Sequence, residues 1–147
     1  MRVEAPIKVD RKTKRLAKRL TGREIAVINH MDIDEVAANS LVEGKVKLVI
    51  NAAQSISGKY PNKGPGILTD KNILIIDNVG QELFDELKEG QIIEVNNGQI
   101  YRDGQLLGEG SVLDKDKVAI KIKEAYDNMS VELDRFIDNT IEYAKKE

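Results

Sequence analysis

Three short runs of almost purely apolar residues most constrain what this chain can fold into. The runs are rich in Ile and Val and occupy residues 24–29, 46–50 and 73–77. Strands of this kind are typical of parallel sheets that are buried on both faces. After the first run, apolar residues at helical spacing predict a helix that ends at Glu43. Together these patterns indicate an α/β fold built from β-α-β units.

A different pattern follows the third run. Leu83, Phe84 and Leu87 predict a helix over residues 81–88, and the stretches beyond it are separated by Asn-Asn-Gly and Asp-Gly turns. Turns of this type join antiparallel strands into hairpins. We therefore expect a parallel layer joined to an antiparallel meander, whose strands are 91–95, 99–101 and 105–107.

A long helix is predicted from Lys115 to Lys146. Its apolar face follows an eleven-residue repeat, with 4-3-4-4-3-4 spacing of Val118, Ile122, Ala125, Met129, Leu133, Phe136 and Thr140. A helix of this length is more than one small domain can cover. We expect the 118–140 stripe to form a homodimer or to meet a downstream domain, with a helix folded back on the body as the alternative. Residues 114–147 are expected to lead into a downstream domain that this chain lacks.

Charge is distributed unevenly along the sequence. Residues 1–23 hold nine Lys or Arg and two acids, a charge of +7, and the whole-chain charge of −2 leaves −9 for the rest. We expect 1–23 to be a basic N-terminal helical arm, with its helix from Asp10 to Leu20, ahead of an α/β domain at 24–113. Such an arm can bind nucleic acid or anionic lipid, or its cations can face water and the protein's own acids. It lacks the exposed aromatic residues of many nucleic-acid binders, so no nucleic-acid partner is expected.

Composition excludes several classes of protein. The sequence has no cysteine, which rules out a disulfide framework and thiolate zinc or redox chemistry. No apolar run approaches the roughly 18–20 residues that span a bilayer. The basic N-terminus leads into no signal-peptide core. We therefore expect a cytoplasmic protein.

A long polar loop, residues 51–65, is the best candidate for a functional site. It follows a presumed parallel strand, and ligands of open α/β sheets bind at the carboxyl ends of such strands. An irregular loop of this length is uncommon in a small domain unless it has a role, although it could be held by its own side-chain-to-backbone hydrogen bonds. Its donors suit a phosphate, a carboxylate or a sugar. The candidate ligand-binding residues are Asn51, Gln54, Ser55, Ser57, Gly58, Lys59, Tyr60, Asn62 and Gly64.

The loop is not a phosphate-binding P-loop. That motif requires Gly where Ala53 stands and Ser or Thr where Tyr60 stands. The Ser-Ile-Ser-Gly-Lys stretch therefore predicts recognition of a ligand without predicting nucleotide hydrolysis.

A second cluster consists of His30, Asp32 and Asp34. His-x-Asp-x-Asp at a strand end could hold a divalent metal, because imidazole and carboxylates are competent ligands. The alternative is that Asp32 caps the following helix, with Glu35 completing a capping box, beside a histidine with satisfied hydrogen bonds. Capping alone accounts for Asp32, so we predict no metal site. We also predict no catalytic residues, because the sequence has no paired acid–base set.

Several stretches of the sequence together resemble one protein family. They are 10–14 (DRKTK), 25–34 (IAVINHMDID), 36–38 (VAA), 51–65 (NAAQSISGKYPNKGP) and 136–140 (FIDNT). Together they resemble the N-terminal region of the cytokinetic-ring protein SteA family, which is often grouped with thiamin-pyrophosphokinase-like proteins. The resemblance covers nearly the whole chain, and the 51–65 motif is specific.

The resemblance implies that this chain is part of a larger bacterial division protein. The family's downstream part is a nucleotide-kinase-like α/β domain followed by a membrane-anchoring C-terminus, and neither is present here. The pyrophosphokinase label and any bound nucleotide would belong to that domain, so no cofactor is expected in this chain. Membrane association at the division site would come only through the absent C-terminal segment.

A second likeness is to the swivelling β/β/α domain of phosphoenolpyruvate-utilising enzymes. It rests on the order and spacing of residues 73–77, 79–80, 87–90, 93–95 and 98. Those domains place a phosphorylated histidine in the loop after the second strand, where this sequence has Gln-Ser-Ile-Ser at 54–57. The likeness therefore implies a swivelling-type fold without phosphohistidine transfer.

The sequence supports two functional hypotheses. The first is a non-catalytic regulatory and interaction domain of a bacterial cell-division protein, which presents the 51–65 loop to a small anionic ligand or a partner. The alternative is a fragment of a thiamin-pyrophosphokinase-like phosphotransferase, in which Lys59 and the loop help to position phosphates for the absent domain.

Overall fold

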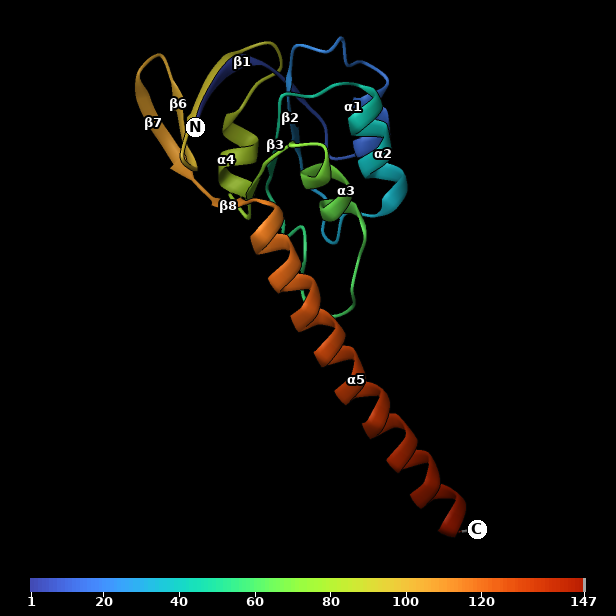
Figure 1. Cartoon of the computed structure of the whole chain (residues 1–147). Helices are drawn as coiled ribbons and strands as arrows, with labels where there is room; N and C mark the ends of the chain where they lie inside the picture. The colour runs from blue at the N-terminus through green and yellow to red at the C-terminus, as the bar shows by residue number, and fades with distance from the viewer. Residues whose placement is uncertain (147) are drawn as a thin grey trace.

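The computed structural model describes residues 1–146, which contain eight strands and five helices joined by loops (Figure 1). The strands are β1 (Arg2–Val9), β2 (Ile25–Ile28), β3 (Leu48–Asn51), β4 (Ile75–Asp77), β5 (Ile92–Asn96), β6 (Gln99–Arg102), β7 (Gln105–Glu109) and β8 (Ser111–Leu113). The helices are α1 (Thr13–Ala17), α2 (Glu35–Glu43), α3 (Gly64–Asp70), α4 (Gln81–Glu86) and α5 (Lys115–Lys146). Glu147, the last residue of the predicted 114–147 segment, lies outside the described residues.

The strands form one mixed sheet with the order β7-β6-β5-β1-β2-β3-β4-β8. β1, β2, β3 and β4 run parallel to one another in chain order. β8 adds antiparallel to β4, and β5, β6 and β7 form an antiparallel meander beside β1. The predicted α/β fold, with its parallel layer and its meander, is confirmed. β8 is a strand that the sequence pattern did not indicate.

β1 joins the two halves of the sheet. Its residues Arg2–Pro6 pair with Ile92–Asn96 of β5, and its residues Ile7–Val9 pair with Ile25–Val27 of β2. One continuous strand therefore belongs to both the antiparallel meander and the parallel layer.

The sheet curls, because its two ends must meet. β7 and β8 lie at opposite ends of the strand order, yet only Gly110 separates them in the chain. The Gly110 amide donates to the carbonyl of Gly98, 2.9 Å away. A Cβ on Gly110 would lie 2.5 Å from the carbonyl oxygen of Asp77, so only glycine allows this close approach.

The two faces of the sheet carry separate hydrophobic clusters. One cluster lies on the face covered by α1, α2, α3 and the first turns of α5, and includes Leu16, Leu41, Leu68 and Val118. The other is enclosed by α4 and the meander. α1, α2 and α3 share a face because successive right-handed crossovers that move in one direction place their helices on one side.

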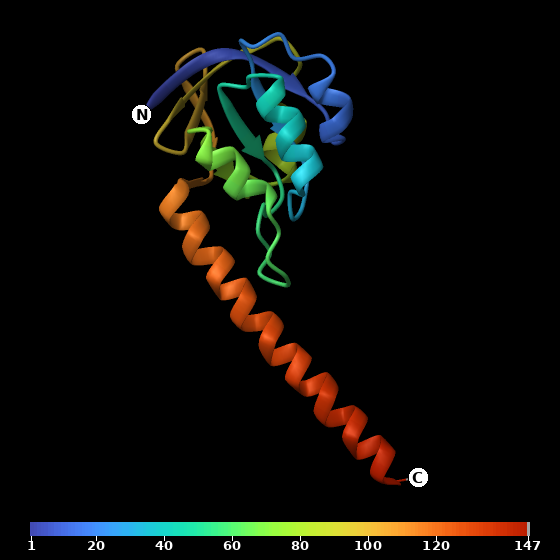
Figure 2. The same cartoon turned by 45° about the vertical axis from the view of Figure 1, so that its right-hand side comes forward.

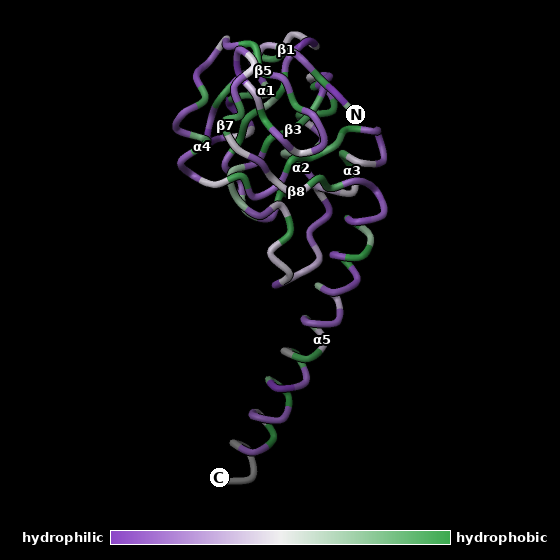
Figure 3. Tube along the Cα trace, turned by 90° about the vertical axis from the view of Figure 1, so that its left-hand side faces the viewer, coloured by the Kyte–Doolittle hydropathy of each residue, from purple (hydrophilic) through white to green (hydrophobic). Residues whose placement is uncertain are grey.

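α5 contacts the domain only through its first turns. Val118 and Ala125 are buried and Ile122 packs against the first cluster, whereas beyond Asn128 the helix runs away from the domain (Figures 1 and 2). The predicted helix over 115–146 is confirmed, and a helix folded back along its whole length is excluded. Figure 3 shows apolar residues recurring along the projecting half.

Nothing in residues 1–146 forms a helix with the length and apolarity that a bilayer crossing requires.

The prediction of a basic helical arm at 1–23 is wrong. Residues 2–9 are an interior strand of the sheet, and the helix is limited to Thr13–Ala17, not Asp10–Leu20. Val3, Ala5 and Ile7 alternate with Arg2, Glu4, Pro6 and Lys8, and Ala5 and Ile7 are buried. This period-2 pattern is typical of a strand, and the high local charge concealed it.

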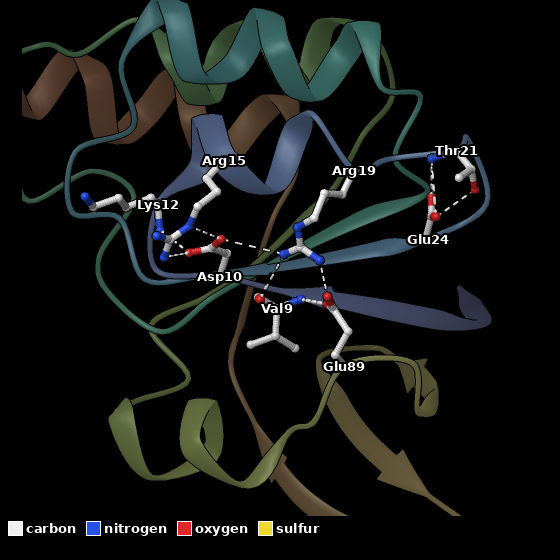
Figure 4. A network of polar contacts seen from close by, with 8 residues as sticks. All are labelled: Val9, Asp10, Lys12, Arg15, Arg19, Thr21, Glu24 and Glu89. Carbon is white, nitrogen blue, oxygen red and sulfur yellow. Dashed lines mark hydrogen bonds and ion pairs between the residues drawn. The ribbon is translucent and has the colours of Figure 1, made fainter.

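Arg15 and Arg19, which follow β1, are paired with the protein's own acids (Figure 4). Arg15 donates from Nε and a terminal nitrogen to the buried Asp10 carboxylate, at 2.6 and 2.7 Å. Arg19 lies 3.6 Å from Asp10 and also pairs with Glu89. The hydrogen bond from Arg15, with help from the Lys12 amide and the charge of Arg19, lowers the pKa of Asp10 to about 2 although burial opposes it. These contacts hold the segment between β1 and β2 against the domain.

Glu24 is held in a similar way at the start of β2. Burial would raise its pKa, but the hydroxyl and amide of Thr21 and the amide of Arg23 donate to its carboxylate and lower the pKa to about 2.

Acid should weaken the fold through both carboxylates. Because the folded-state pKa of each lies below its ordinary value, their stabilisation is present above about pH 4 and is lost as the pH falls through about 2. We expect Asp10→Asn to lower the free energy of unfolding by about 2 kcal/mol at neutral pH and by much less near pH 2, as measured by urea unfolding. Asp103→Asn, in the exposed β6–β7 turn, is the control and should keep the wild-type pH dependence. Equal pH dependence in Asp10→Asn and wild type would contradict the stabilising role of the pair.

Candidate functional site

The loop between β3 and α3 divides into a buried part and an exposed tip. Asn51, Ser55 and Asn62 are buried, whereas Gln54, Lys59 and Tyr60 are exposed. The buried residues, together with Asp77 at the end of β4, form a hydrogen-bonded cluster that we call the loop frame. Residues 57–61 are called the loop tip. The site predicted over 51–65 therefore consists of two parts, a buried loop frame and a solvent-exposed loop tip.

Asn51 ties the end of β3 to the segment that follows β2. Its Oδ1 accepts from the His30 amide at 3.0 Å, and its Nδ2 donates to the His30 carbonyl at 2.8 Å and to Ser55 Oγ at 2.8 Å. The side chain is fully buried, and its hydrogen-bonding groups all point into the protein. Asn51 is a positioning residue rather than a ligand contact.

Ser55 and Asp77 form the base of the loop frame. The Ser55 amide and hydroxyl both donate to Asp77 Oδ1, at 2.9 and 2.7 Å. Burial raises the pKa of Asp77, and the two Ser55 hydrogen bonds and the charge of Lys121 oppose the rise without cancelling it. A serine hydroxyl beside a carboxylate resembles part of a nucleophile arrangement. However, Ser55 is completely buried, so no substrate can reach its hydroxyl.

Asn62 and Gly64 close the loop against the segment before α2. Asn62 Nδ2 donates to the carbonyls of Ile33 and Ser55, at 3.0 and 2.7 Å. The Gly64 amide donates to the Ile33 carbonyl, and a Cβ at this position would lie 2.3 Å from that oxygen. Glycine is therefore required here by close backbone contact and not by a ligand.

The predicted cluster of His30, Asp32 and Asp34 does not converge. His30 Nδ1 lies 2.8 Å from the Thr13 hydroxyl, and Asp32 accepts from the amide and hydroxyl of Ser57, at 2.7 and 2.8 Å. Asp34 accepts from the Ala37 amide at 2.7 Å and is the N-cap of α2. Among residues 1–146, no group of three such side chains is arranged to hold a metal ion.

The prediction that Asp32 caps this helix is wrong. Asp32 adopts a left-handed backbone conformation, with φ of 54°, and its carboxylate is used by Ser57. α2 begins two residues later than that prediction implies, and Asp34 therefore takes the capping role. α3 begins at Gly64, within the predicted 51–65 loop, and has a proline in its first turn.

The loop tip remains available to a binding partner. Lys59 and Tyr60 are exposed, and Tyr60 retains 45% of its accessible surface. Asn128 of α5 donates to the Gly58 carbonyl at 3.1 Å, which holds the tip beside the point where the helix leaves the domain (Figure 2). The tip and α5 therefore contribute to one surface.

Sequence reasoning missed Asp77 and Thr13. Asp77 ends the third apolar run, at the same sheet edge as Asn51, and this shared edge was a usable signal. Thr13 gave no such signal, because its contact with His30 depends on how α1 packs beside β2.

Comparison with known proteins identifies the fold alone. No family model matches the chain, and no curated protein matches it. Among solved structures, the chain is similar to 3-isopropylmalate dehydratase from Methanocaldococcus jannaschii, with a TM-score of 0.53 and 12% identity over 95% of this chain and 99% of that one. At this identity the likeness supports a mixed α/β fold and says nothing about activity.

From the hydrogen bonds of the loop frame we predict different effects on stability for two substitutions at Asp77. Because the folded-state pKa is raised, the stabilisation linked to the protonated carboxyl is present at low pH and is lost as the pH rises through that pKa. Asp77→Asn keeps an acceptor for Ser55 without the charge and should lose less stability than wild type as the pH rises. Asp77→Ala leaves two Ser55 donors unsatisfied and should cost about 1–3 kcal/mol in urea unfolding. Equal stability of the Asn and Ala variants would contradict this arrangement.

Gly64 and Gly66 provide a matched test within α3. Gly64→Ala should destabilise the protein by about 2 kcal/mol, because the new methyl group collides with the Ile33 backbone. A methyl group at Gly66 meets nothing within 4 Å, so Gly66→Ala should be neutral or stabilising by about 0.5 kcal/mol. Thermal unfolding of both variants measures the difference, and a tolerated Gly64→Ala would show that the loop is not fixed at this point.

Proposed function

We propose that this chain is a non-catalytic interaction domain that pairs with a second copy of itself through α5. The observation that carries the proposal is the continuity of one helix face. The face that is buried at Val118 and Ala125 continues into the projecting half of the helix as Met129, Leu133 and Phe136. In the same stripe, solvent exposure rises to 68% at Phe136.

The projecting half of α5 exposes large apolar side chains of the kind found in protein–protein interfaces. Large apolar side chains left in water are costly, and contiguous exposed apolar surface marks interaction sites. The eleven-residue spacing of the stripe keeps it on one side of a nearly straight helix, which suits side-by-side packing of two helices. An identical helix supplies a face that is complementary to itself, as in two-fold symmetric dimers.

The loop tip extends the proposed partner surface. The hydrogen bond from Asn128 to Gly58 places exposed Lys59 and Tyr60 close to the base of the projecting helix. Most polar groups of the 51–65 loop are occupied by the loop frame, which leaves few donors for a small anion. The tip therefore favours contact with a partner over capture of a small anionic ligand by the loop.

The resemblance to SteA proteins supports a narrower version of this proposal. In that version the chain is a regulatory domain of a bacterial cell-division protein, cytoplasmic and linked to the membrane through a segment beyond it. The curled mixed sheet, with α1, α2 and α3 on one face and α4 on the other, is compatible with a swivelling-type β/β/α domain. The alternative, a phosphotransferase fragment, requires Lys59 to act on phosphates, and nucleotide turnover by a longer protein that is abolished by Lys59→Ala would favour it.

Substitutions on the two sides of α5 test pairing. Replacing Leu133 and Phe136 together by Asp should raise the dimer dissociation constant by about a hundredfold or more, because two apolar side chains lose their burial. Sedimentation equilibrium measures the constant. Val131→Asp is the control, since Val131 is also about half exposed, at 51%, but lies on the opposite side of the helix. A wild-type chain that sediments as a 16.4 kDa monomer would overturn the proposed pairing.

A further inference from the structure

We propose that the pocket between α1 and α2 binds a small organic phosphate that carries a flat aromatic ring. The pocket has a volume of about 550 Å³, within the range of small-molecule sites. It lies next to the carboxyl end of β2, at the sheet edge where α/β proteins bind ligands. It is separate from the proposed α5 surface, since α5 contributes no residue to its lining.

Unpaired positive charge lines one side of this pocket. Arg11, Lys12 and Lys14 are exposed and have no acidic partner within residues 1–146, in contrast to Arg15 and Arg19, which bind Asp10. Figure 4 shows the Lys12 side chain extending away from Asp10. Three cations around one concavity attract an anionic group and can donate charge-assisted hydrogen bonds to it.

Asp34 also lines the pocket, but it does not neutralise these cations. Its Oδ1 accepts from the Ala37 amide as the cap of α2, and no described cation is paired with it. The three cations outnumber this single carboxylate in the lining, so the pocket keeps a net positive charge.

His30 adds a fixed polar group to the lining. Its backbone is held on both sides by Asn51, and its Nδ1 lies 2.8 Å from the Thr13 hydroxyl. When the Thr13 hydroxyl donates to Nδ1, the ring proton is on Nε2, which can then donate to a ligand. The loop frame thus positions a side chain of the neighbouring pocket, which gives the buried Asn51 a role beyond the loop itself.

The other side of the pocket is apolar and open to solvent. Met31 and Val36 line it and each retains 55% of its accessible surface. Methionine adapts its shape to its neighbours and its sulfur makes favourable contacts with aromatic rings, and apolar side chains beside a few polar groups are typical of ligand sites. Cations on one side and these two residues on the other match a ligand with a phosphate at one end and a ring at the other.

Calorimetric titration of the full chain with three probes tests the proposal. ADP contains both groups, pyrophosphate only the anion, and adenosine only the ring and sugar. We expect ADP to bind saturably and at least about tenfold more tightly than either of the others. Arg11→Ala with Lys14→Ala should weaken ADP binding by about tenfold or more, because both substitutions remove charge-assisted contacts.

A charge-matched control separates the pocket from general attraction. Lys63→Ala with Lys71→Ala removes the same charge from exposed positions outside the pocket and should leave ADP binding unchanged. Leu133→Asp with Phe136→Asp should also leave it unchanged, so failure of the pocket and failure of the α5 pairing are distinguishable.

Three results would overturn the proposal. The first is the absence of saturable ADP binding, and the second is pyrophosphate binding as tightly as ADP, which would make the pocket a plain anion site. The third is an oligothymidine that binds more tightly than ADP and loses that affinity in the Arg11→Ala, Lys14→Ala variant, which would make this surface a nucleic-acid interface.

Discussion

The pairing of β1 with two strands at once is the constraint on which the rest of the structure depends. Its first half hydrogen-bonds to β5 and its second half to β2, so the antiparallel meander and the parallel layer share one backbone. Because β7 and β8 are one residue apart at opposite ends of the sheet, this arrangement also requires the sheet to curl. Because β1, β2, β3 and β4 are parallel, their carboxyl ends lie at one edge of the sheet, where the loop frame and the basic pocket also lie.

Burial decides which polar groups at that edge can act on a ligand. Asn51, Ser55 and Asp77 hydrogen-bond to one another, and Asn62 Nδ2 donates to the backbone, although Asn62 Oδ1 has no partner among the described residues. Buried polar groups without partners are costly, so these donors and acceptors are directed inward. Their hydrogen bonds fix the loop and hold His30 in place. The groups left for recognition are those that this network does not use, namely the loop tip and the cations that follow β1.

The two proposed surfaces divide the molecule by chemistry and by position. α5 presents an apolar stripe that begins beside the loop tip and continues along the projecting helix, whereas the pocket beside α1 combines cations with a small apolar wall. Figures 1 and 2 show α5 extending away from the part of the domain that holds α1 and α2. A ligand at one surface would therefore be sensed at the other only through the domain between them.

The sequence by itself determined the elements whose pattern is local. The apolar runs at 24–29, 46–50 and 73–77 marked β2, β3 and β4, the turn signals marked the meander, and the spacing from Lys115 onward marked α5. These features are encoded by residues close together in the chain, and their periodicity survives folding.

Only the tertiary structure decided the placement of β1 and the roles of the loop residues. Residues 2–9 carry a weak alternating pattern amid charge, and they become a strand because β2 and β5 provide partners on both sides. Asn51, Ser55 and Asn62 have the composition of a binding loop, but long-range packing brings Asp77 and the His30 and Ile33 backbone to them. The sequence shows which side chains can donate hydrogen bonds. Whether such a donor is buried and already paired depends on residues that are distant in the chain.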